Sequence, residues 1–388
     1  MTESAGGGAP AAAGVATGAT ARRRWLRWGA AIVAALVLVG GGTAAALAVR
    51  ARYDVPTAEL FDGGGAGALT SPTPTPTPTV EPGAGITGPL NFLIVGIDPR
   101  VSVPNWRPNA DAVLILHVTA TLDEAYLFSL PRDLVVDIPA FRKARFGGTR
   151  TKLTHAMSYG SKVPGTDKPN VAQGFQLLAT TVSAYTGITR FDAGAVLNFG
   201  GFTKLVDAVG GVDMFVDMQV TSRHREPDGD HRRAGRGGYI GPQMVYPKGM
   251  HHFTGWQALD YGRQRYLTGG DYTRQRHQQQ LIKALVGKIL DQDMARDPAK
   301  LDAVLRAVGD TLTFDGRGRG VIDFAYALRE IAPADITLVG LPGAGVGRGS
   351  GYRGEQLKAA GKQFLTAVRE DRVAQFLAAN PTLVNKER

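Results

Sequence analysis

An uncharged run at residues 29–49 constrains this chain more than any other feature. It is long enough to cross a bilayer, where a helix satisfies its backbone polar groups within one segment. Arginines are denser before the run than after it, and Trp25 and Trp28 suit the interfacial belt, so the N-terminus is predicted to be cytoplasmic. A cleaved signal peptide is the alternative, because Ala46-Leu47-Ala48 resembles a cleavage site. The length of the run favours an uncleaved, single-pass membrane anchor.

Composition divides the rest of the chain. Residues 1–28 are Gly/Ala-rich and then basic, which predicts a disordered cytoplasmic tail, and residues 50–88 form a Gly-, Pro- and Thr-rich linker outside the membrane. One folded domain is predicted over 89–375, with a C-terminal tail at 376–388. The chain has no cysteine, which excludes disulfides, thiolate metal sites and thiol nucleophiles. Its net charge of +10 predicts acidic partners such as phosphates, anionic lipid or nucleic acid.

Within the domain, apolar strand patterns alternate with helical ones. Strands are predicted at residues 91–97, 112–119, 125–130, 193–197, 212–216 and 336–341. Helices are predicted after the N-cap residues Asn170 and Asn198, and after the capping box of Thr254 and Gln257. Residues 221–243 and 343–348 are predicted to be loops. The fold class is therefore α/β, with a central mixed sheet flanked by helices as an α/β/α sandwich.

The stretch at residues 263–290 combines arginines with a buried helical stripe. Asp271 is a predicted N-cap, and carrying the apolar stripe back along the helix places Arg274 and Gln278 on its core-facing side. Arg276 and Lys283 fall on the solvated side. An arginine on a buried face needs an anion, which Asp271 could supply internally or a bound phosphate could supply instead. Just upstream, two more arginines end another helical run, at 263 and 265.

Carboxylates and further cations flank the predicted strands. Asp98 and Asp111 suit Mg²⁺ that carries substrate phosphates, although two solvated loop aspartates are the alternative. Arg100 and Arg132 beside them complete a set of residues suited to phosphoryl transfer. Lys152 is either a phosphate contact or a solvated lysine. The absence of GxxxxGK[ST] argues against ATP use.

Seven segments, in order, resemble the LytR-CpsA-Psr family. They are GIDPR (96–100), NADAVLI (109–115), SLPRD (129–133), TKLTHA (151–156), LNFGGFTKLVDAVGGVDM (197–214), ALDYGRQR (258–265) and DYTRQRHQQQ (271–280), all within residues 90–290. The resemblance implies Asp98 and Asp111 as Mg²⁺ ligands. It implies pyrophosphate binding and catalysis by Arg132, Arg263, Arg265 and Arg274, with Arg100, Lys152 and Gln278 as further substrate contacts. Thr154 and His277 depart from the family pattern.

The same resemblance implies a function at the cell wall. Family members are thought to move a glycopolymer from a polyprenyl-pyrophosphate carrier to a peptidoglycan hydroxyl, leaving a phosphodiester link. The catalytic domain would then be extracytoplasmic, with the polyprenyl chain in an apolar groove between the sheet and a covering helix. Candidates for the general base are Asp98, Asp133 and Asp271. A non-catalytic lipid-pyrophosphate receptor or envelope scaffold is the alternative, and the membrane anchor argues against a nucleic-acid partner.

Overall fold

The computed structural model describes residues 29–30, 58–61, 83–98, 103, 105–236, 238–291, 304 and 306–386. Of the predicted anchor it describes only strand β1 (Gly29–Ala30), which is extended where a helix was predicted and pairs in parallel with β15 (Glu330–Ile331). The rest of the anchor, the tail at 1–28, Arg100 and most of the linker lie outside the described residues. Within the described ranges, no helix has both the length and the hydropathy of a membrane span.

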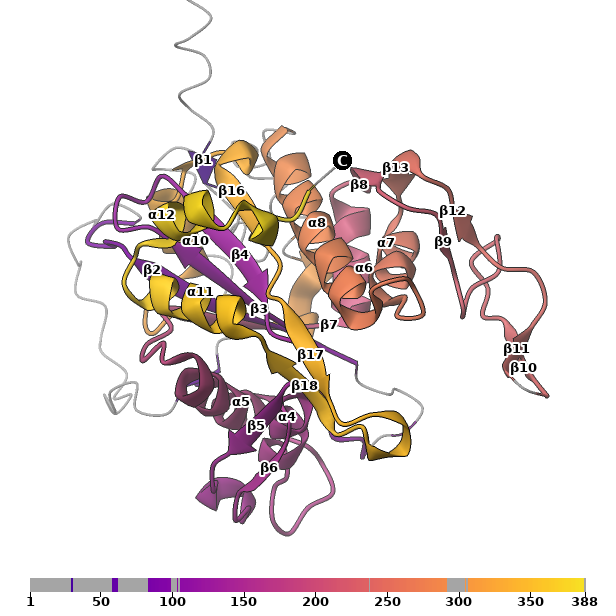
Figure 1. The fold of residues 1–388 in the computed structure, drawn as a ribbon, viewed down its shortest axis with the longest axis horizontal. Coiled ribbons are helices and arrows are strands. Elements are labelled where there is room, and N and C mark those ends of the chain that lie inside the picture. Colours follow the sequence, from indigo (N-terminus) through magenta and orange to yellow (C-terminus); the bar gives the residue numbers. More distant parts are fainter. Residues whose placement is uncertain are drawn as a thin grey trace, which may run out of the picture.

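A six-stranded mixed sheet forms the centre of the domain (Figure 1). Its order is β14 (Leu312–Asp315), β7 (Ala193–Asn198), β2 (Leu90–Ile97), β3 (Ala110–Val118), β4 (Ala125–Ser129) and β16 (Ile336–Val339). β7 runs parallel to β2 and β16 parallel to β4, whereas the other three pairings are antiparallel. The predicted mixed sheet is confirmed, and the segment beyond residue 290 supplies both of its edge strands.

Helices cover both faces of this sheet. One layer holds α6 (Phe199–Ala208), α7 (Gly255–Arg263), α8 (Gly270–Asp291) and α10 (Val321–Ala327), and the other holds α4 (Thr154–Gly160), α5 (Val171–Thr186), α11 (Ala359–Arg369) and α12 (Val373–Ala379). Alternate residues of β2 separate the two cores: Phe92 and Ile94 pack with the first layer, Leu93 and Val95 with the second. The predicted α/β/α sandwich is therefore the observed architecture.

The helices predicted from N-cap residues begin at those residues, and the capping hydrogen bonds are present. The Asn170 side chain accepts the N–H of Gln173 at 2.9 Å, and Asn198 caps α6 in the same way at 2.8 Å. Gln257 reaches back to the N–H of Thr254 at 3.0 Å, which is the reciprocal half of a capping box. These contacts satisfy donors that a helix leaves unpaired in its first turn.

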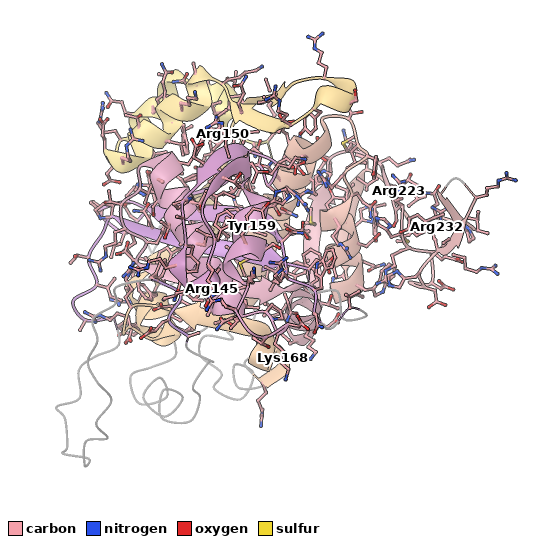
Figure 2. All side chains as sticks on the ribbon, turned by 90° about the horizontal axis from the view of Figure 1, so that it is seen from below. Arg145, Arg150, Tyr159, Lys168, Arg223 and Arg232 are labelled. Carbon is pink, nitrogen blue, oxygen red and sulfur yellow. The ribbon has the colours of Figure 1, made fainter. Side chains whose placement is uncertain are left out.

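Two segments predicted as loops contain strands. Within the first, residues 221–243, β10 (Arg233–Gly235) pairs with β11 (Gly238–Ile240), and at its two ends β9 (Val220–Thr221) pairs with β12 (Val245–Tyr246). We call residues 220–246 the basic arm; it projects from one side of the domain and carries Arg223 and Arg232 (Figures 1 and 2). The second segment forms β17 (Gly343–Val346), paired with β18 (Gly354–Leu357).

Further short elements complete the chain. They are β5 (Val135–Ile138) with β6 (Thr149–Lys152), β8 (Val212–Val216) with β13 (Gly249–Phe253), and the 3₁₀ turns Arg142–Ala144, Gly309–Thr311, Pro333–Asp335, Gly349–Gly351 and Pro381–Leu383. The predicted boundary after residue 375 falls inside α12. The chain also packs beyond it, because the Asn385 N–H donates to Leu338 O at 2.8 Å and its side chain donates to Gln279 at 2.8 Å.

Candidate functional site

The sheet topology brings the predicted carboxylates and arginines together at one end of the central strands. β2 and β4 both run antiparallel to β3, so the ends of β2 and β4 lie beside the start of β3. Asp98 follows β2, Arg132 follows β4, and Asp111 is the second residue of β3. The end of α7 and the first turns of α8 lie over this end of the strands and add the remaining arginines.

These side chains surround one cavity of about 320 Å³, which we call the site cavity. Its lining comprises Asp98, Trp106, Asn109, Asp111, Arg132, Phe199, His224, Arg263, Arg265, Arg274 and Gln278. Seven of the nine predicted site residues are therefore together. Lys152 lies beside the cavity rather than in its lining, and Arg100 lies outside the described residues.

Each carboxylate at this end of the strands is paired with a cation. Asp98 accepts from Arg263 at 3.0 Å, and Asp111 is in direct contact with Arg132. Asp133 is a buried hub behind the cavity. It lies 3.1 Å from Arg265, 3.5 Å from Lys152 and 3.7 Å from the Arg132 Nε.

A second hub forms at the start of α8. The helix begins at Gly270, so Asp271 lies in its first turn rather than at the predicted N-cap. Its carboxylate accepts from Arg274 at 2.8 Å and Gln275 at 3.0 Å, and lies 3.4 Å from Arg265. Burial raises the pKa of Asp271, but Arg274 and Arg265 outweigh burial and hold that pKa below its usual value. The internal partner for Arg274 is thus present, and Arg274 lines the site cavity as well.

The like charges around the cavity are only partly compensated. Burial lowers the pKa of Arg132; Arg265 and Arg274 lower it further, while Asp133 opposes them. A guanidinium nevertheless stays charged at neutral pH. Four arginines line the cavity against two lining carboxylates, so an anion bound there would relieve repulsion between the arginines.

Arg276 and Lys283 lie outside the cavity lining, as predicted, but each is only partly exposed and has a partner. Arg276 forms an ion pair with Asp217 at 2.6 Å. Lys283 donates to the Ile336 carbonyl at 2.9 Å and is half-buried. His277 is fully buried, 3.2 Å from Asp217 and stacked on Tyr261, so its departure from the family pattern serves packing. By contrast Gln278 faces the cavity as predicted, with its amide donating to Gly262 O at 3.0 Å.

Comparison with known proteins decides the family. Residues 72–368 match the LytR_cpsA_psr family. The chain belongs to this family. It is 26% identical to cell wall biosynthesis protein LcpA of Corynebacterium glutamicum, over 84% of this chain and 61% of LcpA. It is 28% identical to biofilm regulatory protein A of Streptococcus mutans, over 58% of this chain and 49% of that protein. The chain thus spans less than two thirds of these two relatives.

A third family member is matched over more of its length. The polyisoprenyl-teichoic acid–peptidoglycan teichoic acid transferase TagU of Enterococcus faecalis is 26% identical over 66% of this chain and 73% of TagU. Two crystal structures share the fold. TagV of Bacillus subtilis is 18% identical, with TM-score 0.53, covering 74% of this chain and 98% of TagV. A Streptococcus agalactiae protein is 23% identical, with TM-score 0.55, covering 75% of this chain and 88% of that chain.

Four cavity residues were not predicted: Trp106, Asn109, Phe199 and His224. His224 comes from the basic arm, whose sequence shows no periodicity that would place it. Its ring packs edge-on against Tyr239, 5.0 Å between centroids, and forms no hydrogen bond to any residue in the described ranges. Burial lowers the pKa of His224, and the charge of Arg263 lowers it further. The cavity therefore includes a neutral imidazole at neutral pH.

The side chains near Asp98 and Asp111 fit part of a magnesium shell. No cluster of three or more metal-binding side chains occurs in the part of the chain that the structure describes. Mg²⁺ does not require one, because it usually keeps several waters and takes one or two carboxylates plus substrate phosphates. Both carboxylates line the site cavity with Asn109, and Asp111 Oδ1 is buried in contact with the Arg132 guanidinium.

An apolar pocket adjoins the site cavity. It lies between β2 and β3 on one side and α6, α7 and α8 on the other, and shares Phe199, Arg263 and Gln278 with the cavity. Apolar side chains including Ile94, Leu114, Leu197, Phe202, Leu259 and Leu281 line the rest. The pocket is narrow, about 80 Å³. A charged cavity thus lies next to an apolar pocket between the sheet and its covering helices, where the groove was expected.

Proposed function

We propose that this protein is a membrane-anchored phosphotransferase of cell-wall assembly. It would move a glycopolymer from a polyprenyl-pyrophosphate carrier to a peptidoglycan hydroxyl outside the cytoplasmic membrane. One observation carries the proposal: the four-arginine site cavity adjoins an apolar pocket, and this pairing suits a ligand with a pyrophosphate head and a lipid tail. The names of relatives such as TagU and LcpA support the same class of reaction.

The arginines would bind the donor and stabilise the leaving group. Arg132, Arg263, Arg265 and Arg274 come from three separate chain segments, so they can surround a pyrophosphate rather than meet it from one side. Guanidinium groups present paired N–H donors that match phosphate oxygens. Negative charge grows on the leaving polyprenyl phosphate as the bond breaks, and fixed donors aimed at that charge lower the barrier. Lys152, held beside Asp133, would add positive charge behind them.

Asp98 and Asp111 would hold Mg²⁺. When bound, the ion would neutralise charge on the phosphate oxygens. Both carboxylates are paired with arginines in this structure, so Arg263 and Arg132 lie beside the groups that would hold the ion and are placed to bind the phosphate oxygens next to it.

The acceptor hydroxyl needs a base, and we assign His224 to this role. Of the earlier candidates, Asp133 and Asp271 each engage two or more cations and do not line the site cavity, and Asp98 is assigned to the metal. His224 lines the cavity with a neutral ring. The hydroxyl oxygen would attack the phosphorus next to the glycan and give its proton to His224. The bond from that phosphorus to the bridging oxygen would break, releasing polyprenyl phosphate.

Turnover tests the proposal. Full-length protein is incubated with a polyprenyl-pyrophosphate glycan and peptidoglycan fragments, and released polyprenyl phosphate is counted per protein. We expect many equivalents and a phosphodiester-linked product. Tight donor binding without release beyond one equivalent would instead establish a non-catalytic lipid-pyrophosphate receptor.

A further inference from the structure

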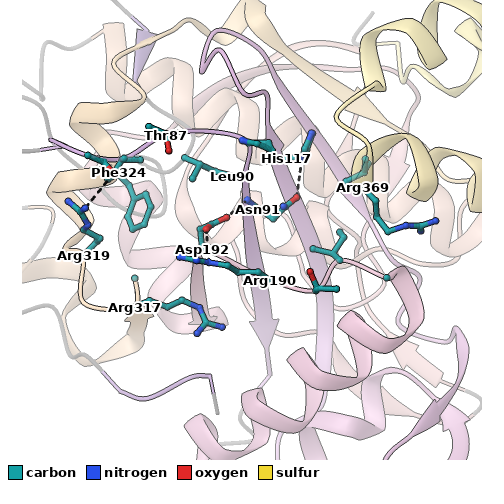
Figure 3. A pocket seen from close by; sticks show the side chains of 18 residues that line it. Thr87, Leu90, Asn91, His117, Arg190, Asp192, Arg317, Arg319, Phe324 and Arg369 are labelled. Carbon is teal, nitrogen blue, oxygen red and sulfur yellow. Dashed lines mark hydrogen bonds and ion pairs between the residues drawn. The ribbon is translucent and has the colours of Figure 1, made fainter. Parts of the chain in front are cut away.

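A second cavity lies at the opposite end of the central strands. It has a volume of about 460 Å³ and is lined by the start of β2, at Leu90 and Asn91, and by His117 near the end of β3 (Figure 3). The site cavity begins where β2 ends. Eight residues of strand at about 3.3 Å each separate the two by roughly 26 Å. They are therefore distinct sites on one domain.

Four arginines from three chain segments line this second cavity. Arg190 comes from the connection between α5 and β7, Arg317 and Arg319 from the turn between β14 and α10, and Arg369 from the end of α11. Figure 3 shows the first three on one side of Asn91 and Arg369 on the other. Asp192 is the single carboxylate among the described lining residues. The lining is thus strongly positive.

Neutral groups hold three of these arginines in place. Arg317 donates to a backbone carbonyl at 2.7 Å and lies over the Phe61 ring at 4.3 Å. Arg319 and Arg369 donate to backbone carbonyls at 2.6 and 2.8 Å. A carbonyl orients a guanidinium without neutralising it, so each keeps its charge and several N–H donors. Oriented but uncompensated arginines are arranged to bind an anion.

The nearby acids are already engaged. Asp192 accepts the Asn91 N–H at 2.9 Å and lies 3.1 Å from Arg190. Asp371 is paired with the buried His117 at 2.9 Å and accepts the Ala120 N–H at 3.0 Å. Neither acid is an ion-pair partner of Arg317, Arg319 or Arg369.

We propose that the second cavity binds a polyanionic glycan through its repeated phosphate or carboxylate groups. The proposal rests on the proposed function, because the transferred polymer would be the ligand, and it adds that this polymer is anionic. The volume lies within the range of about 300–1,000 Å³ typical of ligand pockets. Charges spread around a cavity of this size match several anionic groups better than one.

Binding by full-length protein in detergent micelles tests this. The probes are a glycerol-phosphate oligomer, an oligogalacturonate, neutral dextran and inorganic phosphate. The variant is Arg317→Gln with Arg319→Gln, and the charge-matched control is Arg145→Gln with Arg150→Gln, two exposed positions outside both cavities. We expect at least one anionic oligomer to bind more tightly than inorganic phosphate and far more tightly than dextran. Its affinity should fall tenfold or more in the variant and less than twofold in the control.

The two anionic oligomers identify the source of the charge. Preference for the phosphate oligomer indicates a phosphodiester polymer, and preference for the galacturonate indicates a uronic acid polymer. Equal affinity in the variant and the wild type would overturn the proposal, as would an oligomer that binds no tighter than inorganic phosphate. The proposal would also be overturned if binding of anionic phospholipid vesicles depended on Arg317 and Arg319 while binding of the oligomers did not.

A further variant separates this proposal from the proposed function. Arg132→Gln should weaken a polyprenyl-pyrophosphate analogue and leave oligomer binding intact, because Arg132 lines only the site cavity. If oligomers bind through Arg317 and Arg319 but no transfer occurs, the proposed function fails and the second site stands. If transfer occurs and oligomers ignore both arginines, the second site fails alone.

Discussion

Replacing Arg274 by glutamine should cost both stability and donor binding, for separable reasons. Arg274 is 3% exposed; its Nε and Nη2 each lie 2.8 Å from Asp271 Oδ1, and its Nη1 donates to the Asp111 carbonyl at 2.9 Å. Removing one partner of a buried ion pair typically costs about 3–5 kcal/mol. Because Arg265 and Gln275 still contact Asp271, we expect the lower end, about 3 kcal/mol. For a domain of this size that lowers Tm by roughly 6–12 °C.

A charge-neutral double variant separates the two effects. Arg274→Gln with Asp271→Asn removes both charges, so most of the lost Tm should return. Donor affinity should not return, since the guanidinium is absent, and turnover should stay about 10²–10³-fold low. Thermal unfolding and titration with a soluble polyprenyl-pyrophosphate analogue measure the two quantities. Wild-type affinity in the double variant would show that Arg274 serves only as the partner of Asp271, and the pyrophosphate site would have to be reassigned.

The same pair makes stability depend on pH. The folded-state pKa of Asp271 lies below its usual value, since the guanidinium groups outweigh burial. Its contribution is therefore fully present above about pH 4 and is lost as pH falls through the folded-state pKa. In Arg274→Gln the guanidinium that opposes burial is gone, so the folded-state pKa of Asp271 rises. The loss of stability on acidification then begins at a higher pH. Melting temperatures of both proteins between pH 3 and 7 should diverge in this way.

Four further predictions concern the metal, the base, the lipid tail and the topology. Asp98→Ala or Asp111→Ala should weaken divalent-ion dependence as well as rate; an unaltered wild-type rate in EDTA would contradict this. His224→Gln should abolish the rise of kcat with pH below about 6.5, whereas His231→Gln, outside the site cavity, should keep it. Phe202→Asp should weaken long-chain isoprenoid donors more than short-chain ones, since it places a charge in the apolar pocket; an equal loss would place the tail elsewhere. A reporter fused to the C-terminus should be active only outside the cytoplasm, and cytoplasmic activity would exclude the proposed substrate.

Predictions from the sequence succeeded where local rules also decide the structure. Strand ends placed Asp98 and Arg132, and the apolar stripe placed Arg274 and Gln278, because those rules depend on short spacings. The same periodicity placed Arg276 outside the cavity but did not reveal its ion pair, because the partner, Asp217, lies far away in the sequence. A pattern shows which way a side chain points on its helix, but it does not show what another segment places there.

The basic arm shows the same limit on a larger scale. Its short strands pair only with each other and lack the apolar alternation of core strands, so its sequence resembles a loop. Consequently the sequence predicted a loop here, but not the strands of the arm or the position of His224 at the cavity. The second cavity was also not found, because its arginines are scattered singly along the chain.

The edge strand β16 has a consequence for how the domain is made. It pairs with β4 although most of the domain lies between them in the sequence, and Asn385 then ties the last described residues to the same strand. Long-range pairing of this kind is slow, because the intervening chain must be ordered before the contact forms. Until the C-terminal segment arrives, β4 exposes unpaired backbone groups that can template aggregation. A chain truncated before Ile336 would remain in that state, so the C-terminus acts as the closing step of folding although it contributes nothing to the lining of the site cavity.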